Sequence, residues 1–306
     1  MDTLGIRQIE LDIFADPQGG EFFLRLGPIL VGENPLGPLP LLFAGMKVLH
    51  IPHLDFETSC YSLGGCLQQL KSWSNANPYH LPVMVLVEVK SGAFGADAAE
   101  SAAAGEMGLE TIPVPANFEA SDFDALDAEI RFIFSEDKIF SPDDQRGAHA
   151  TLEQSVLSNG WPALGMLRGQ VLFALDNGGA ERTTYLAGHP SLEGRVMFTN
   201  SSPGQNDAAF VKVNDPLASP TQIPDLVSSG YLVRTRADTD TEEARSGDTV
   251  RRDAALASGA QFISTDFPIP STQPGFSDYS VEIPGESLAR CNPVTGPSGC
   301  RNDVLE

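Results

Sequence analysis

The sequence predicts an α/β protein of the TIM-type (β/α)8 barrel class, and two observations support this prediction. Short β-branched runs alternate along the chain with segments of helical apolar spacing, as parallel β/α units require. Residues 82–90 are apolar at nearly every position, which is typical of a strand buried on both faces of a parallel sheet. We count seven main strands, whereas a closed barrel of this class has eight. We therefore expect the barrel to lack its first strand, which should precede residue 1.

The expected elements follow the chain in order. The main strands are expected at residues 5–13, 46–52, 82–90, 169–176, 194–200, 231–238 and 260–266, with a further short strand at 208–213. Helices are expected at residues 63–73, 123–134, 151–158, 223–229 and 241–258. Residues 15–45 are rich in Gly, Pro and Leu without a sustained period, so we expect a long excursion there after the first strand. Residues 91–120 read as a loop of small residues.

The chain of 306 residues is long enough for one large barrel with additions. We expect the barrel over residues 1–268 and a C-terminal extension over residues 269–306, because the chain becomes rich in Pro, Gly and Ser there. The four cysteines fall as two close pairs, Cys60 with Cys66 and Cys291 with Cys300. This favours two small disulfide loops, although spacing does not fix the connectivity. Each loop would contribute about 2–3 kcal/mol, and the second would staple the extension.

Disulfide loops indicate an oxidising compartment, so we expect an extracellular or periplasmic protein. No basic segment followed by an apolar core, as in a signal peptide, precedes Gly5, so we expect the N-terminus to be incomplete. No apolar run approaches the roughly 20 residues of a membrane span.

The chain is strongly acidic, with a formal net charge of -22 from 41 acidic and 19 basic residues. Such a field repels nucleic acid, which argues against a nucleic-acid partner. It also repels anionic membranes beyond a Debye length of about 8–10 Å, so a membrane contact would be transient. Nothing in the sequence indicates an obligate protein partner.

Carboxylates at the ends of two expected strands indicate a cation site. Side chains alternate along a strand, so Glu10 and Asp12 share one face of the first expected strand, near its end. Glu88 and Lys90 repeat this geometry at the end of strand 82–90. Clustered carboxylates repel one another unless a cation neutralises them, and oxygen ligands suit Ca²⁺ or Mg²⁺. The alternatives are a solvated acidic edge for the first pair and a simple Glu88–Lys90 ion pair for the second.

Two further groups are candidates for phosphate chemistry. His50 lies near the end of strand 46–52, where it is either catalytic or a hydrogen-bonded core histidine, and His53 just beyond it is the alternative for the same role. Arg234 and Arg236 share a face near the end of strand 231–238 and could clamp a phosphate. The competing interpretation of the two arginines is internal pairing with Asp238 or Asp266, which we favour.

The chain resembles the Ca²⁺-dependent phosphatidylinositol-specific phospholipase C-like proteins of the secreted microbial type, within the superfamily of phospholipase C-like phosphodiesterase barrels. No single motif carries the resemblance; the order and spacing of several do. These are GIRQIELDI at 5–13, VLHIPHLDF at 48–56, C-x5-C at 60–66, WSNANPYHLPV at 73–83, VEVK at 87–90, WPALGMLRGQVLF at 161–173 and ARCNPV at 289–294.

The resemblance implies roles for the candidate residues. Glu10, Asp12 and Glu88 would hold calcium, His50 would be a catalytic histidine, and Lys90 would lie near the substrate phosphate. The implied reaction is attack of the inositol 2-hydroxyl on the phosphodiester, which releases diacylglycerol and forms a cyclic inositol phosphate. The family also carries a second catalytic histidine and a calcium-binding asparagine on a first strand that this chain does not show.

None of the remaining histidines takes that place, so we expect impaired catalysis if the chain is taken literally. The histidines considered are His53, His80, His149 and His189. Two alternative functions therefore stay open. One is a glycerophosphodiester phosphodiesterase acting on soluble headgroup esters, which the acidic charge favours. The other is a catalytically impaired, secreted binding protein of the same fold. The products would separate the enzymes, since one gives a cyclic inositol phosphate and the other gives glycerol phosphate.

Overall fold

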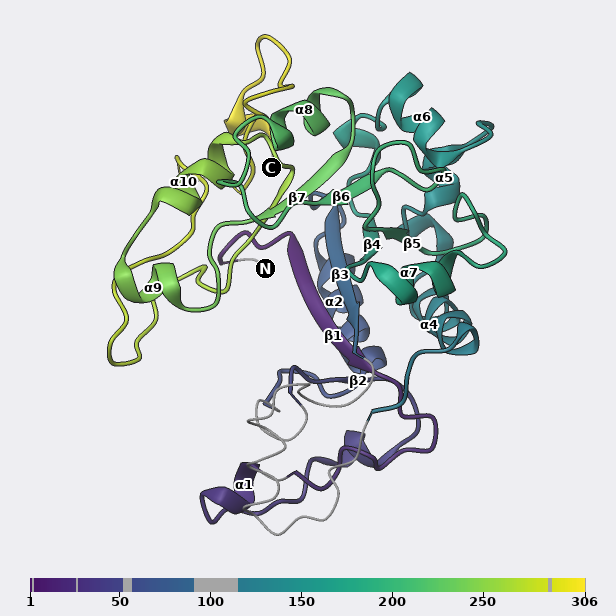
Figure 1. Ribbon diagram of the computed structural model, residues 1–306, viewed down its shortest axis with the longest axis vertical. Coiled ribbons are helices and arrows are strands. Elements are labelled where there is room, and N and C mark those ends of the chain that lie inside the picture. The colour runs from purple at the N-terminus through teal and green to yellow at the C-terminus, as the bar shows by residue number, and fades with distance from the viewer. Residues whose placement is uncertain (2, 26, 52–56, 91–114, 286–287, 306) are drawn as a thin grey trace.

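The computed structural model describes residues 1, 3–25, 27–51, 57–90, 115–285 and 288–305. Its strands form two sheets, one of five strands in the order β2-β1-β3-β4-β5 and one of three in the order β6-β7-β8 (Figure 1). His53 and most of the loop expected at residues 91–120 lie outside the described residues.

The first sheet is mainly parallel. Its parallel strands are β1 (Gln8–Phe14), β3 (Val83–Val89), β4 (Val171–Leu175) and β5 (Met197–Thr199). Every residue of β4 is buried, and β3 is buried except at Glu88, as the continuous apolar run predicts for a strand covered on both faces. The register of β1 against β3 pairs Asp12 with Glu88. This pairing brings the carboxylates of two segments together at one edge of the sheet.

The strand expected at residues 46–52 is much shorter and runs the other way. It is β2 (Lys47–Val48), which pairs antiparallel with the last residues of β1. Between the two strands, the described residues include no long helix that could carry the chain back for a parallel pairing, so the chain returns antiparallel to β1. Lys47 fixes the return because its ammonium is buried 3.0 Å from Asp16 Oδ2 and also donates to the carbonyls of Phe43 and Gly45.

The second sheet continues the parallel series with β6 (Phe210–Lys212), β7 (Leu232–Arg236) and β8 (Phe262–Ser264). A parallel bridge from Asn200 to Phe210 joins it to the first sheet. Among the described residues no backbone pairing joins β8 to β1, and the two strands meet through a side-chain hydrogen bond of 2.5 Å from Gln8 to Ser264. The strands therefore form two adjoining sheets, and their pairing among the described residues does not itself establish a closed barrel.

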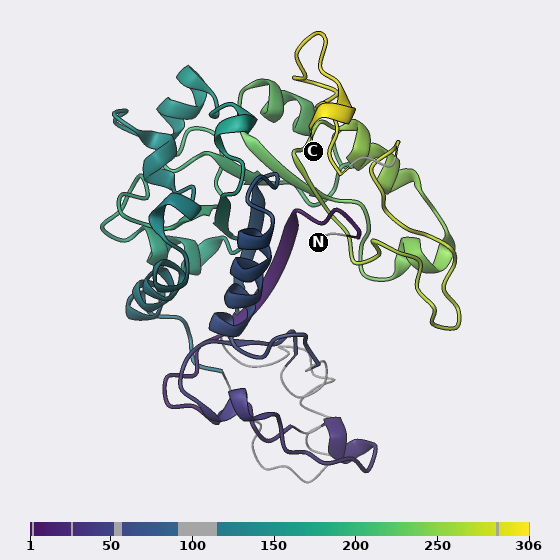
Figure 2. The same ribbon diagram turned by 180° about the vertical axis from the view of Figure 1, so that it is seen from behind.

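Helices lie outside the strands (Figures 1 and 2). Those that match expected helices are α2 (Leu63–Ala76), α4 (Ala120–Ile133), α6 (Leu152–Asn159) and α8 (Gln222–Ser228). Three short helices had no counterpart in the sequence pattern: α1 (Gly27–Leu30), α5 (Pro142–Arg146) and α7 (Gly179–Leu186). The single helix expected at 241–258 is two, α9 (Glu242–Ser246) and α10 (Val250–Ala257). Gly247, with φ of 75°, ends the first of them in the left-handed conformation.

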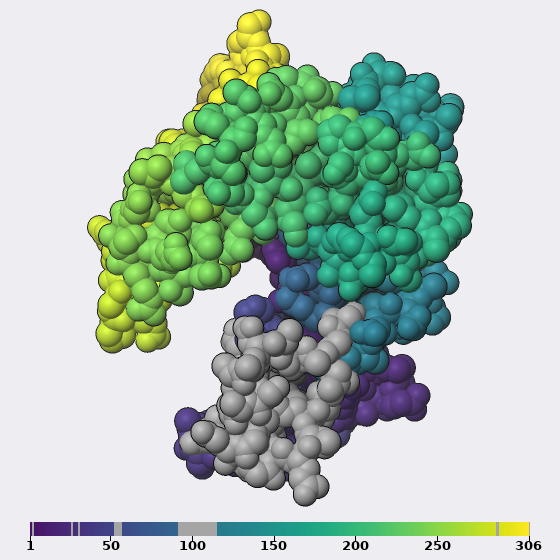
Figure 3. All heavy atoms as spheres, in the orientation of Figure 1, coloured from purple at the N-terminus to yellow at the C-terminus, as the bar shows by residue number. Residues whose placement is uncertain are grey.

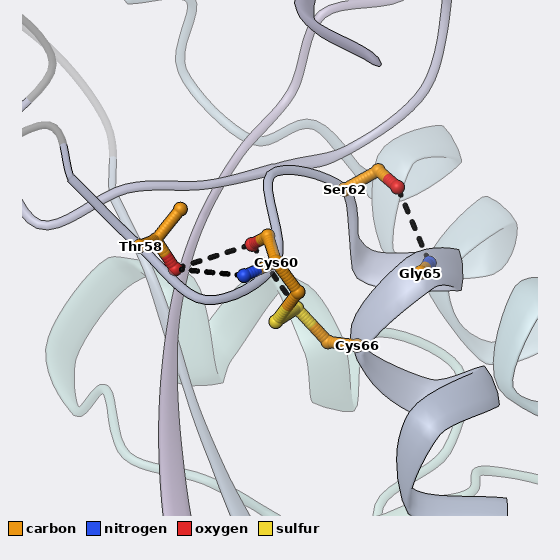
Figure 4. Close-up of a disulfide and its surroundings, with 5 residues drawn as sticks. All are labelled: Thr58, Cys60, Ser62, Gly65 and Cys66. Carbon is orange, nitrogen blue, oxygen red and sulfur yellow. Dashed lines mark hydrogen bonds between the residues drawn. A yellow bond between two sulfur atoms is a disulfide. The ribbon is translucent and has the colours of Figure 1, made fainter. Parts of the chain in front are cut away.

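Both disulfides join the cysteines that lie close in sequence, Cys60 to Cys66 and Cys291 to Cys300. Figure 4 shows the first beside the start of α2, where the Ser62 hydroxyl accepts a hydrogen bond of 3.2 Å from the Gly65 N–H. Residues of the C-terminal extension pack against the second sheet: the buried Tyr279 donates a hydrogen bond of 2.8 Å to the carbonyl of Ala237. No helix of the described residues has the length and apolarity to cross a bilayer.

Candidate active site

Three carboxylates converge where β1 and β3 end. Asp12 lies opposite Glu88 in the register, and Glu10 lies two residues before Asp12 on the same face of β1. One oxygen from each carboxylate lies within 4.8 Å of the others. The neighbouring residues Leu11 and Ile13 are buried on the opposite face, so core packing holds the acidic face toward the site.

The crowding changes the acidity of these groups. Partial burial raises the pKa of Glu10, and Arg234 opposes the rise. Burial also raises the pKa of Asp12 to about 6, with Lys90 opposing and Glu88 adding to the rise. Both directions mean that the negative form is disfavoured where these side chains lie. A cation bound by the three carboxylates would relieve this cost.

Lys90 supplies part of that positive charge from within the chain. Its ammonium lies 2.7 Å from Glu88 Oε2 and 3.2 Å from Asp12 Oδ2. Burial disfavours the charged form of Lys90, but the hydrogen bond to Glu88 and the charge of Asp12 outweigh it and raise the lysine pKa. The ion pair that the sequence left as an alternative is therefore present, and it includes Asp12 as well as Glu88.

His50 lies on the rim of the same cluster. Its Nε2 is 4.0 Å from Asp12 Oδ2, and its side chain is 61% exposed. The alternative of a core histidine is wrong, because so exposed a ring lies at a solvent-accessible edge. The backbone N–H of Leu49 donates to the carbonyl of Asp12 at 3.2 Å, which fixes this stretch beside the end of β1.

The two arginines of β7 have different surroundings. The Arg234 side chain is only 5% exposed and contacts Glu10 Oε2 at 3.1 Å, together with the side chains of Asn214 and Ser264 at 2.6 Å each. Arg236 lies 3.7 Å from Asp266. Internal pairing thus describes Arg236 as expected, whereas Arg234 pairs with the carboxylate cluster instead of Asp238 or Asp266.

Sequence reasoning passed over a second ion pair at the same mouth. Lys212, at the end of β6, forms an ion pair with Asp176, which directly follows β4. Asp176 is close enough to Glu10 to raise its pKa. Both residues stand at strand ends in the sequence, so the signal that identified Glu88 and Lys90 could have identified them. The side chain of the neighbouring Asn177 accepts a hydrogen bond of 2.8 Å from the N–H of Val89 and donates one of 2.9 Å to its carbonyl. These two bonds fix the end of β3.

This constellation fits a hard divalent cation. All three converging donors are carboxylates, the ligand type that Ca²⁺ prefers, and the surrounding lysines and arginine are suited to an anionic phosphate. Parallel strands that gather carboxylates, an exposed histidine and cations at their C-terminal ends are an arrangement suited to a class of enzyme, the metal-dependent phosphodiesterases built on β/α folds.

Comparison with known proteins identifies the family within that class. The chain belongs to the family described as "Phosphoinositide phospholipase C, Ca2+-dependent", whose model matches residues 1–293. It is therefore a Ca²⁺-dependent phosphodiesterase of the phospholipase C type. This result does not favour the glycerophosphodiester phosphodiesterase or the inactive binding protein.

One solved structure shows a related fold, and a second is reported beside it as a further match. A Ca²⁺-dependent phosphatidylinositol-specific phospholipase C from Streptomyces antibioticus is 18% identical, with a TM-score of 0.54 over 87% of this chain and 86% of that one. A calcium-dependent phosphoinositol-specific phospholipase C from Pseudomonas sp. is 18% identical, with a TM-score of 0.48 over 78% of this chain and 77% of that one. A search of curated proteins found no match.

Proposed function

We propose that this chain cleaves phosphatidylinositol-type lipids into diacylglycerol and a cyclic inositol phosphate, with Ca²⁺ held by Glu10, Asp12 and Glu88. The observation that supports this most is the convergence of their three oxygens within 4.8 Å at the strand ends. When bound, calcium supplies acidification of the inositol 2-hydroxyl and charge stabilisation at the phosphate oxygen.

The remaining residues bind and protonate the substrate. Lys90 and Arg234 flank the carboxylates with side chains that donate hydrogen bonds, so they orient the phosphodiester over the cluster. Arg236, at the outer end of β7, adds a further positive charge for binding the phosphate. The inositol 2-hydroxyl gives up its proton to solvent water as its oxygen bonds to phosphorus. The bond between phosphorus and the diacylglycerol oxygen breaks in the same step, and His50 Nε2 donates a proton to the departing oxygen. Histidine suits this role because its titration lies nearest to neutral pH among side chains.

The proposal also covers the location of the enzyme, its contact with the membrane and its domain bounds. The two disulfides support an extracellular or periplasmic location. A phospholipid substrate requires contact with a membrane surface, which we take to be transient. We take residues 1–268 as the catalytic domain and residues 269–306 as an extension packed on it.

Product analysis tests the function directly. Phosphatidylinositol is incubated with the protein in Ca²⁺ or in chelator, and the phosphorus products are followed by ³¹P NMR. We expect a cyclic inositol phosphate in Ca²⁺ only. His50→Gln should lower the rate roughly 10²–10⁴-fold, while His149→Gln, at a histidine bonded to Asn159 on another part of the chain, should not. Phosphatidate and free inositol as the products, or equal rates in the two variants, would refute the proposal.

A further inference from the structure

A cavity of about 380 Å³ is formed by residues of α5, of α6 and of the short stretches that follow these helices. Its lining combines polar and aromatic side chains, among them Gln145, Arg146, Asn159 and Trp161. Small-molecule pockets in proteins typically have volumes of roughly 300–1,000 Å³. The cavity is therefore large enough to hold a small ligand.

The cavity lies at the end of the strands opposite to the candidate active site. Trp161 precedes β4, and its indole N–H donates a hydrogen bond of 2.9 Å to the carbonyl of Gly230, which precedes β7. Asp176, at the mouth of the candidate active site, instead follows β4. Figures 1 and 2 show α5 and α6 far from α1, and Figure 3 shows the teal surface of this region away from the purple N-terminal atoms. A ligand bound in the cavity would therefore not contact the carboxylate cluster.

Two buried polar atoms of the lining side chains have no hydrogen-bond partner among the described residues, Gln145 Oε1 and Arg146 Nε. Gln145 is only 5% exposed, and its Nε2 donates a hydrogen bond of 3.0 Å to the carbonyl of Gly160. Because a carbonyl only accepts, this bond fixes the orientation of the amide and leaves Oε1 without a donor. Buried polar atoms nearly always have partners in folded proteins, so these two atoms indicate that a further group binds in the cavity.

The two atoms need opposite partners, which restricts the chemistry of the ligand. Gln145 Oε1 requires a donor and Arg146 Nε requires an acceptor. An ammonium group cannot accept and an ionised carboxylate cannot donate, whereas a hydroxyl group does both. Charge points the same way, because Asp143 already neutralises the Arg146 guanidinium and the net charge of -22 repels anions. A neutral ligand that carries several hydroxyl groups therefore fits best.

Trp161 adds an apolar surface to these polar groups. Its ring packs on Phe198 and Phe140, with ring centroids 5.5 and 6.1 Å apart, and these core contacts fix the indole at the wall of the cavity. A fixed aromatic wall beside hydrogen-bonding side chains suits a ring whose carbons are apolar and whose substituents are hydroxyl groups.

We propose that the cavity binds a neutral six-membered ring with neighbouring hydroxyl groups, which packs on Trp161 and forms hydrogen bonds with Gln145 and Arg146. Two sources carry this chemistry, a pyranose sugar of a glycan and a free inositol. The site is separate from the three carboxylates. The proposal does not depend on the proposed function, because it requires neither Ca²⁺ nor a phosphodiester.

The two tryptophans of the chain provide a direct readout. Trp161 lines the cavity while Trp73 belongs to α2, so their indole N–H signals in a ¹H–¹⁵N NMR spectrum report on separate places. Methyl α-glucopyranoside, methyl α-mannopyranoside and myo-inositol are titrated into the protein in chelator, and Trp73→Phe assigns the signals. We expect at least one compound to shift the Trp161 signal saturably without moving that of Trp73. Binding of a methyl glycoside would assign the site to a glycan, and binding of myo-inositol alone would assign it to free inositol.

Variants that remove the two unpaired atoms test the proposed contacts. Gln145→Leu should weaken binding roughly three- to ten-fold, as expected for the loss of one hydrogen bond. Its matched control is Gln170→Leu, because Gln170 also has a buried Oε1 without a partner among the described residues but does not line the cavity. Arg146→Met should weaken binding to a similar extent, and it keeps the test independent of whether Gln145→Leu folds. Arg131→Met, at another ion-paired arginine, is the control for Arg146→Met.

Absence of a saturable Trp161 shift with all three compounds would overturn the proposal. Wild-type affinity in both Gln145→Leu and Arg146→Met, or equal losses in the control variants, would also overturn it. A Trp73 signal that moves together with that of Trp161 would mean a change of the whole fold instead of binding in the cavity, and would count against the proposal.

Discussion

Lys90 stabilises the folded protein, and this role can be measured separately from catalysis. It is the shared cation of Asp12 and Glu88, at 3.2 and 2.7 Å. Lys90→Met removes the charge while keeping most of the side-chain length. In chelator we expect the free energy of unfolding to fall by about 1–3 kcal/mol, because two half-buried carboxylates lose their partner. Added Ca²⁺ should shrink this deficit, since the bound cation neutralises the same oxygens.

Urea denaturation in chelator and in Ca²⁺ provides the comparison. Lys138→Met is the matched control, because Lys138 lies outside the site and its ammonium donates a hydrogen bond of 3.5 Å to the Gly169 carbonyl. The substitution in the control should change the free energy of unfolding only slightly, and by the same amount in chelator and in Ca²⁺. A Lys90→Met deficit that is unchanged by Ca²⁺ would mean that no cation binds these carboxylates.

Individual site residues could be predicted where a local rule governs them. The two-residue period of a strand placed Glu10 and Asp12 on one face, and the shared edge of parallel strands placed Glu88 near them. The partners of Arg234 could not be predicted, because its contact with Glu10 depends on how two distant strands face each other across the ring. The roles of these residues in binding and catalysis stay predictions.

At the scale of elements, the entry into β4 depends on a glycine. Gly169 has φ of +75°, and a Cβ there would overlap the carbonyl oxygen of Pro78 in the connection between α2 and β3. Gly194 has the same φ of +75° with open space around it. Gly194→Ala should therefore cost only about 1–2 kcal/mol of stability for the left-handed backbone.

Gly169→Ala should cost about 1–3 kcal/mol more than Gly194→Ala, because the added methyl group forces the two connections apart. Both variants pay the cost of a left-handed backbone at alanine. The difference between their free energies of unfolding therefore measures the cost of the close contact with Pro78 alone. Equal losses would show that the chain can separate from Pro78 without strain.

Element boundaries were predictable where the pattern is long and local. The continuous apolar run of β3 lies nearly at the expected residues, whereas β2 is short and antiparallel, and its Lys47 forms a buried ion pair with Asp16. That pairing joins side chains 31 residues apart, and periodicity carries no information about it. The break between α9 and α10 at Gly247 was a local signal, but we read the segment as one helix.

At the scale of the whole molecule, charge is arranged in two opposing ways. The net charge of -22 attracts divalent cations from a distance, while Lys90, Lys212 and Arg234 gather near the carboxylates at the strand ends. The long-range field therefore favours Ca²⁺, and the local cations favour the substrate phosphate. The parallel barrel-like order was predictable from alternation. The contact between β1 and β8 was not predictable, because the hydrogen bond from Gln8 to Ser264 joins side chains 256 residues apart.

Calorimetric titration of Ca²⁺ tests the central claim most directly, namely that the three carboxylates form one cation site. The matched variants are Asp12→Asn in the cluster and Glu242→Gln at an exposed position in the first turn of α9. Wild type and Glu242→Gln should bind Ca²⁺ with equal affinity, and Asp12→Asn should bind roughly ten-fold more weakly or worse, because one charged ligand becomes neutral. Undiminished Ca²⁺ binding by Asp12→Asn would contradict the account.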